Sequence, residues 1–247
     1  MVNVNESRLQ RRLSPERLDH LAPADPLAIR SRADLRRINR LMGSGGLIAR
    51  ALQAHAVRMP PLRDHRPQRI IELGAGDGSL MLRLAKKFAQ RWPGAHLTLL
   101  DRQNVVGAST LDEFDRLGWT VDVLCLDVNE WIAASVRERW DMAIANLFIH
   151  HFDSSTIAAL FTALGERCNW FMACEPRRSR LRLLASRLIF LAGANAVTRE
   201  DAVLSVRAGF SDTELSALWP RRASQWVRQE GPAGLFSHTF VAYRKGT

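Results

Sequence analysis

The sequence predicts an α/β fold in which a helical N-terminal cap precedes a doubly wound, mostly parallel, seven-stranded sheet. Three observations lead to it. A strand-like run ends in a glycine-rich turn and continues as a helical pattern over residues 70–88. Short apolar runs then alternate with helical stretches, as in sheets whose parallel strands are joined by helices. Two further apolar runs, near 224–230 and 236–243, are typical of a closing antiparallel hairpin at one edge.

The first part of the chain is expected to form a basic helical cap over residues 1–66, followed by the main domain over 67–247. Three prolines, the last of them Pro26, make the first 33 residues irregular. A helical pattern follows over 33–55, with Ser31 or Asp34 as its cap, and the glycines at 43–46 divide it in two. Prolines at 60, 61 and 67 mark a linker.

The main domain alternates regularly between strands and helices. Strands are expected at 69–73, 96–101, 120–126, 141–147 and 169–174. Helices are expected at 78–91, 104–117, 129–138, 155–166 and 178–192. The segment Pro232–Gly234 is expected to turn the closing hairpin.

Composition narrows the class of protein. With 47% hydrophobic and 24% charged residues, the chain of 247 residues has an ordinary globular balance. No apolar run reaches the length of a membrane span, and the N-terminus has no signal-peptide core. The 3 Cys lack Cys-x-x-Cys spacing, so neither a disulfide framework nor a zinc site is expected. We therefore expect a cytoplasmic protein.

The net charge of +10 is concentrated at the N-terminus, where residues 1–69 carry 14 Arg and 6 acidic residues. Such a segment could contact RNA, an anionic membrane surface or an acidic substrate. A solvated surface is the simpler explanation, because the excess of Arg over Lys runs through the whole chain.

The glycine-rich turn reads Glu72-Leu-Gly-Ala-Gly-Asp-Gly78, the pattern E-x-G-x-G-x-G. The dinucleotide fingerprint requires a glycine at the next position, which is Ser79, so a nicotinamide dinucleotide is disfavoured. The pattern resembles motif I of the class I S-adenosylmethionine (SAM)-dependent methyltransferases.

Acidic residues end three successive expected strands: Glu72, Asp101 and Asp127. In a doubly wound sheet the carboxyl ends of the strands form the ligand crevice. Each acid alone could cap a helix or lie on the surface, but the ordered set favours a ligand.

The resemblance implies SAM as the cofactor. It places the ribose hydroxyls on Asp101, the adenine amine on Asp127 and the methionine end on Glu72. The other cofactor-binding residues expected from it are Gly74, Ala75, Gly76, Arg102, Val128 and Asn146.

Two histidines, His150 and His151, follow the expected fourth strand, in a loop that would border the methyl group in the resembling fold. An oxygen acceptor must lose a proton during transfer, and histidine titrates near neutral pH. We expect one of the two to take that proton; packing or helix capping is the alternative. No metal is expected. The tetrapeptide typical of N6-adenine methyltransferases is absent after Ala145.

Glu175 and Arg178, after the fifth strand, are expected to border or bind the acceptor. The segment 198–210 would form a lid over the acceptor together with the N-terminal helices, although an ordinary packed helix fits it almost as well.

Three segments more loosely resemble a bacterial small-molecule subgroup associated with type III polyketide synthases: residues 34–43, 146–152 and 174–179. This resemblance implies secondary metabolism and a phenolic or quinol oxygen as acceptor, with a lipid-like tail and peripheral membrane contact as possibilities. An RNA methyltransferase and a non-catalytic SAM-binding protein are the alternatives.

Overall fold

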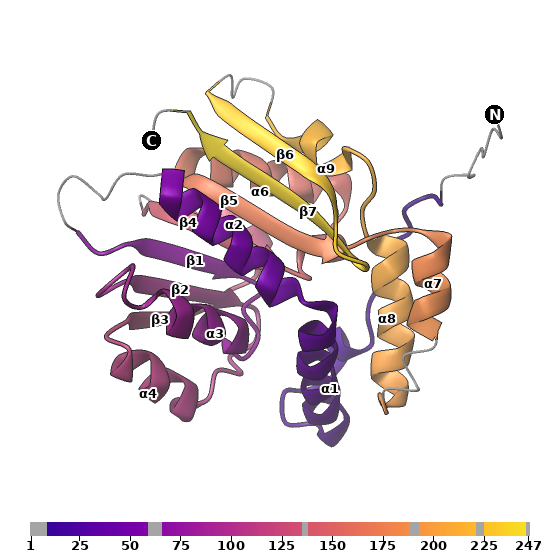
Figure 1. Cartoon of the computed structure of the whole chain (residues 1–247). Helices are drawn as coiled ribbons and strands as arrows, with labels where there is room; N and C mark the ends of the chain where they lie inside the picture. Colours follow the sequence, from indigo (N-terminus) through magenta and orange to yellow (C-terminus); the bar gives the residue numbers. More distant parts are fainter. Residues whose placement is uncertain (1–8, 59–65, 135–137, 188–192, 221–224, 246–247) are drawn as a thin grey trace.

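The computed structural model describes residues 9–58, 66–134, 138–187, 193–220 and 225–245. These residues form one sheet with the strand order β3-β2-β1-β4-β5-β7-β6 (Figure 1). The strands are β1 (Arg69–Leu73), β2 (His96–Asp101), β3 (Thr120–Cys125), β4 (Trp140–Asn146), β5 (Cys168–Pro176), β6 (Trp226–Ala233) and β7 (Ser237–Arg244). β1 to β5 pair in parallel, whereas β7 is antiparallel to both β5 and β6. The predicted seven-stranded, mostly parallel sheet with an edge hairpin is confirmed.

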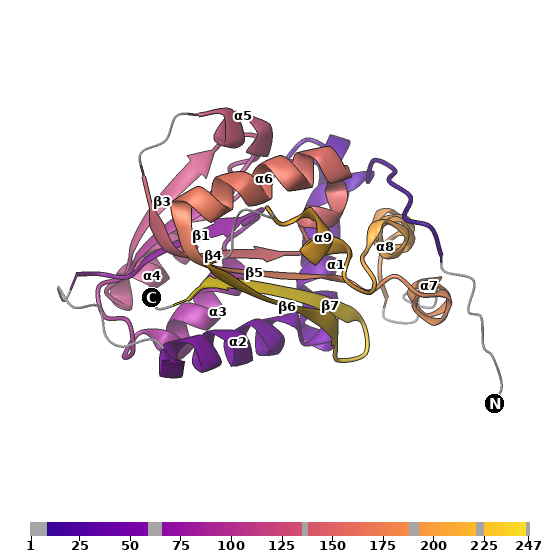
Figure 2. The same cartoon turned by 90° about the horizontal axis from the view of Figure 1, so that it is seen from above.

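Helices cover both faces of the sheet (Figure 2). One face packs against α5 (Val128–Ala133), α6 (Ser154–Arg167) and α9 (Glu214–Leu218). The other packs against α2 (Ser44–Arg58), α3 (Ser79–Phe88) and α4 (Ala108–Arg116). Successive residues of a strand point to opposite faces. Because helices cover both faces, the inner strands β1, β4 and β5 are buried along nearly their whole length.

The first long helix, α1 (Pro26–Met42), begins earlier than the sequence predicts. The Asp25 side chain caps it, and Pro26 occupies the first turn, where its missing N–H is not needed for a helical hydrogen bond. The expected cap at Ser31 or Asp34 and the expected interruption at Pro26 are therefore wrong.

The predicted break between two N-terminal helices is present, because Gly43 ends α1 in a left-handed conformation with φ of 72°. The helix that follows, α2, contributes Ile48 and Leu52 to the core under the sheet, and its His55 ring stacks on Trp170 at 5.1 Å between centroids. Thus the expected cap of residues 1–66 is divided. α2 covers a face of the sheet, while α1 stands at its end (Figure 1).

Most other expected elements differ from the structure only at their ends. The expected helix at 129–138 ends at Ala133, and of the expected helix at 178–192 the structure describes α7 (Arg180–Arg187). Residues 135–137, 188–192 and 224, and the linker prolines at 60 and 61, lie outside the described residues. Pro232 lies within the edge strand β6 rather than in the turn, which suits a residue without a backbone donor.

Among the described helices, none combines the length and apolar character needed to cross a bilayer.

The insertion between β5 and β6 stands beside α1 at the carboxyl ends of the parallel strands (Figure 1). It consists of α7 and α8 (Ala196–Ala208), and the chain then returns to the sheet at Phe210, whose N–H donates to the carbonyl of Pro176 at 2.9 Å. A Cβ atom at Gly209 would lie 2.2 Å from that carbonyl oxygen. Glycine at this position therefore allows the insertion to close against β5.

We predict that Gly209→Ala lowers the free energy of unfolding by about 1–3 kcal/mol, because backbone has to move to admit the methyl group. The matched control is Gly46→Ala in α2, where a Cβ would have no neighbour within 4 Å. That change should raise stability by about 0.5–1 kcal/mol. Urea unfolding measures both, and equal stabilities for the two variants would contradict the packing described for Gly209.

Candidate functional site

The glycine-rich turn after β1 lies against the loop that follows β4. The N–H groups of Gly74 and Ala75 both donate to the carbonyl of Leu100, at 2.9 and 3.0 Å. Gly74 has φ of +68°, and a Cβ there would lie 2.2 Å from the ring of Phe148. Only glycine therefore fits where the two loops meet.

The acids at the ends of β2 and β3 have protein partners. Asp101 accepts the N–H of Gly76 at 2.9 Å and that of Gln103 at 2.9 Å, so it fixes the turn from the neighbouring strand. Asp127 is the N-cap of α5 and forms a capping box with Glu130. Capping, the alternative weighed for each acid alone, thus occurs at Asp127. The next residue, Val128, is buried, and the Arg102 guanidinium forms an ion pair with Asp19 at 2.9 Å.

A cavity of about 420 Å³ opens between the glycine turn and the helices at the end of the sheet. The turn side of its wall includes Glu72, Gly74, Ala75, Gly76 and Asn146. The opposite side comes from α1, α7, α8 and residues 16–19, and both predicted histidines also line it. Asp101, Arg102, Asp127, Val128, Glu175 and Arg178 are predicted site residues that do not line this cavity.

Three buried oxygen atoms on residues of the cavity wall have no hydrogen-bond partner among the described residues: Asn39 Oδ1, Glu72 Oε2 and Asn146 Oδ1. Burial, with the nearby charges of Asp77 and Asp101, raises the pKa of the Glu72 carboxyl well above its ordinary value. A buried acceptor without a donor is costly, so these atoms are suited to a ligand that brings N–H groups.

Arg83 on α3 lines the same cavity. Its guanidinium has no hydrogen bond or ion pair within the described part of the chain, and partial burial lowers its pKa. Three residues with unpartnered acceptors and Arg83 therefore line one cavity, next to the glycine turn.

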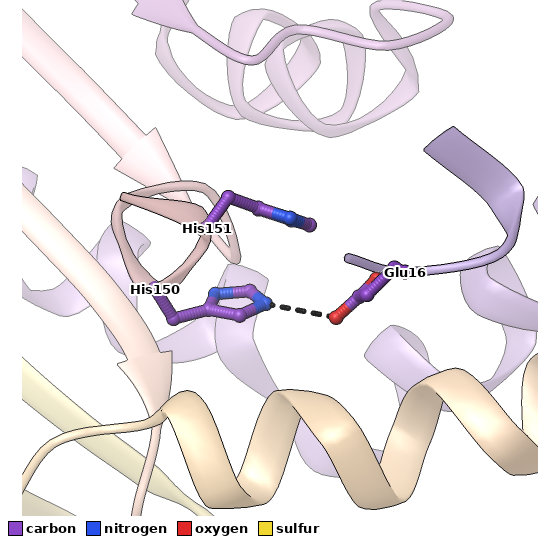
Figure 3. Close-up of side chains that lie close together, drawn as sticks. All are labelled: Glu16, His150 and His151. Carbon is purple, nitrogen blue, oxygen red and sulfur yellow. Dashed lines mark ion pairs between the residues drawn. The ribbon is translucent and has the colours of Figure 1, made fainter. Parts of the chain in front are cut away.

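The two histidines lie in the short 3₁₀ helix η2 (Ile149–His151), where each faces acidic side chains. His150 is buried. Its Nδ1 lies 2.7 Å from Glu175, and its Nε2 lies 3.4 Å from Glu16, a residue of the N-terminal segment (Figure 3). Burial alone would lower the pKa of His150, but the neighbouring carboxylates of Glu16 and Glu175 raise it to about 9. His151 is a quarter exposed and pairs with Asp19 at 3.2 Å.

The two residues expected to meet the acceptor have structural roles instead. Glu175 is fully buried behind His150, where its carboxylate also accepts the backbone N–H groups of Phe148 and Ile149. The Arg178 guanidinium donates to the carbonyls of Leu9 and Gly209, and it forms an ion pair with Glu214. Both residues hold segments that build the site, and neither lies on the cavity wall.

Glu16, His150 and His151 are also the group of described residues whose ligand atoms, all within 4.8 Å of one another, have the arrangement of a possible metal site. Their proximity has another explanation. With a pKa near 9, His150 carries a positive charge at neutral pH, and this charge lies between the carboxylates of Glu16 and Glu175. We therefore assign no ion to this group.

Sequence reasoning missed Glu16, Asn39 and Arg83. Asn39 and Arg83 each interrupt an apolar helical pattern, and this signal could have identified them as residues facing a polar ligand. Glu16 gives no such signal, because the contact with His150 joins residues 134 positions apart and depends on the path of the N-terminal segment.

No protein-family model matches the chain, and no curated protein matches it by sequence. Solved structures do resemble it. The plantazolicin methyltransferase BpumL, in complex with SAH, is 13% identical over 90% of this chain and 92% of its own, with a TM-score of 0.62. The magnesium protoporphyrin IX methyltransferase ChlM from Synechocystis PCC 6803, with bound SAH, is 14% identical over 93% and 91%, with a TM-score of 0.51. The chain thus has the Rossmann-like fold of these methyltransferases.

Proposed function

We propose that this protein is a SAM-dependent methyltransferase that acts on a small-molecule acceptor. One observation carries the proposal: Asn39, Glu72 and Asn146, each with a buried oxygen that lacks a partner among the described residues, line one cavity beside the glycine turn together with Arg83. The amino-acid end of SAM is a zwitterion, whose ammonium donates hydrogen bonds and whose carboxylate accepts them. The acceptor residues of this cavity suit the ammonium, and the Arg83 guanidinium suits the carboxylate.

The carboxylates around the glycine turn disfavour a phosphate-bearing cofactor. An anion at the turn would need free N–H groups at the start of α3. Asp101 already accepts the N–H of Gly76, and Asp77 accepts that of Ser79. Their carboxylates would also repel a pyrophosphate.

The nucleoside end of SAM is assigned to the ends of β2 and β3, next to the turn. Asp101 and Cys125 are paired residues of the two strands, so Asp101 and Asp127 lie at the same end of the sheet. Each carboxylate retains acceptor capacity beyond the backbone bonds that it makes. We propose Asp101 for the ribose hydroxyls and Asp127 for the adenine amine, with the N–H of Val128 at the adenine ring and Arg102 flanking it.

The acceptor is proposed to enter between the turn and the helical cap. Leu35, Ile38 and Met42 of α1 and Val206 of α8 give this side of the cavity an apolar wall, which suits an aromatic or lipid-like molecule. A phenolic or quinol oxygen is our proposed acceptor atom. SAM, when bound, supplies the methyl group on a sulfonium, so the protein must orient the acceptor, exclude water and remove one proton.

We propose that His150 takes this proton. Its ring is fixed by Glu175 and borders the cavity together with Glu16. His151 is more exposed and pairs with Asp19, so it is better placed to hold residues 16–19 over the cavity.

An RNA acceptor is less well supported, because part of the basic N-terminal charge is used within the protein. Arg11 binds the carbonyls of His150 and Phe152, and Arg36 forms an ion pair with Asp77 at 2.7 Å. The names of the two structural neighbours also point to acceptors other than nucleic acid.

The direct test of function follows the methyl group. We expect that radiolabelled SAM, incubated with the protein and cell extract, labels a small-molecule or lipid fraction. Label confined to RNA would show the alternative acceptor class, and no transfer despite SAH binding would indicate a non-catalytic protein. Heat-inactivated protein is the control.

The assignment of the cofactor site predicts that two substitutions weaken the binding of SAH. Glu72→Gln and Arg83→Ala should each reduce the affinity for SAH at least about tenfold, because each removes a charge-assisted hydrogen bond to the amino-acid end. Lys87→Ala, on the exposed side of the same helix, is the matched control and should bind SAH like the native chain. Calorimetry measures all of them, and native affinity in both site variants would contradict the assignment.

The raised pKa of His150 predicts a dependence of stability on pH. A histidine with a folded-state pKa near 9 and an ordinary value of 6.5 stabilises the fold fully below pH 6.5, and this stabilisation is lost as the pH rises through about 9. His150→Gln should therefore remove most of the fall in unfolding free energy between these pH values. Urea unfolding across this range, with His20→Gln as an exposed control, tests it; an unchanged pH profile in His150→Gln would refute the charged state.

If His150 acts as the base, transfer should also accelerate from pH 7 towards 9 as its ring becomes neutral. The labelled fraction from the extract assay provides the acceptor for this measurement. A rate in His150→Gln equal to that of the native chain would exclude His150 as the base.

A further inference from the structure

Four large apolar side chains are exposed on two segments that are in contact, α7 and the tip of the β6–β7 hairpin. Leu181 and Leu184 on α7 are 68% and 57% exposed, and Leu235 and Phe236 at the tip are 73% and 36% exposed. The two segments are in contact, since the Arg182 side chain donates to the carbonyl of Leu235 at 2.8 Å. We call these four residues the rim patch. Large apolar side chains exposed on adjoining segments point to an interaction surface.

The two segments that form the rim patch, residues 177–187 and 231–237, contain 5 Arg and no acidic residue. One of these arginines, Arg178, is buried and paired with Glu214. Arg180 is exposed and Arg177 is partly exposed at the same edge. Leucines interleaved with arginines on a short helix are typical of segments that lie at a membrane interface.

The rim patch is continuous with the mouth of the cavity. Phe236 belongs both to the patch and to the cavity wall, and Arg182 and Ala185 of α7 line the same wall. Whatever contacts the rim patch therefore lies at the entrance through which an acceptor would pass.

We propose that the rim patch docks the protein on an anionic lipid surface. Charge selects this partner over a second copy of the chain. In a symmetric pair the arginines around one patch would face those of the other, and the chain carries a net charge of +10. An anionic bilayer offers negative headgroups for the arginines and an apolar boundary for the leucines. Docking needs no membrane-spanning helix.

Docking stands independently of the proposed methyl transfer. If both hold, an acceptor with an apolar tail reaches the cavity from the bilayer without crossing water; this consequence alone rests on the proposed function.

Co-sedimentation of the full chain with vesicles tests the proposal. We expect binding to vesicles of phosphatidylcholine mixed with phosphatidylglycerol, weaker binding at high salt, and little binding to phosphatidylcholine alone. The double variant Leu181→Asp, Leu235→Asp should bind anionic vesicles at least about tenfold more weakly. Arg180→Gln should lose about fivefold.

The matched control is the double variant Ile29→Asp, Val57→Asp, which adds the same two charges at apolar side chains on α1 and α2 that are 52% and 75% exposed and lie outside the rim patch. This control should bind vesicles more strongly than the rim-patch double variant. Equal binding by the two would overturn the proposal, as would failure of the native chain to bind anionic vesicles. Thermal unfolding and SAH affinity, measured on the same proteins, show that each is folded. Absence of SAH binding in the native chain would refute the proposed function and leave the docking result intact.

Discussion

A buried carboxylate without a protein partner is the constraint on which this site depends. Glu72 ends β1 inside the sheet, where burial disfavours its charge and no described side chain donates to its Oε2. Hydrophobic or neutral residues at this position would cost less in the free protein. Glu72 lines the cavity, so a donor that binds there can compensate its carboxyl, and this links the local energetics to binding of a cation such as an ammonium group.

The remaining architecture brings the cavity walls to this carboxylate. Gly74 allows the turn to lie against Phe148, which fixes the loop that carries the two histidines. Gly209 lets α7 and α8 close against the end of β5. The N-terminal segment then crosses α8, held by Asp201, which accepts the N–H groups of Arg17 and Leu18, and it places Glu16 against His150. Residues 16–18 are thus tied down by hydrogen bonds to α8 and by an ion pair with His150.

The sequence was sufficient for the sheet and its helices, because strand alternation and glycine turns are local signals. Glu72, the glycine turn and the two histidines line the cavity, and the sequence placed them there because each lies at or directly after a strand end. The sequence did not predict the roles of residues that depend on tertiary contacts. Glu175 was expected in the acceptor pocket but supports His150 from behind, and Arg178 was expected at the acceptor but binds Leu9, Gly209 and Glu214. Glu16 reaches the site because of the path that the N-terminal segment takes. No periodic pattern in the sequence predicts that path.

The most direct test of the account is the titration of the Glu72 carboxyl, followed by ¹³C NMR and assigned by comparison with Glu72→Gln. In the free protein we expect it to remain protonated well above the ordinary glutamate pKa of 4.5. Addition of SAH should ionise it at the same pH, because the ammonium group favours the charged form. A Glu72 that titrates normally in the free protein, or that does not respond to SAH, would contradict the central claim.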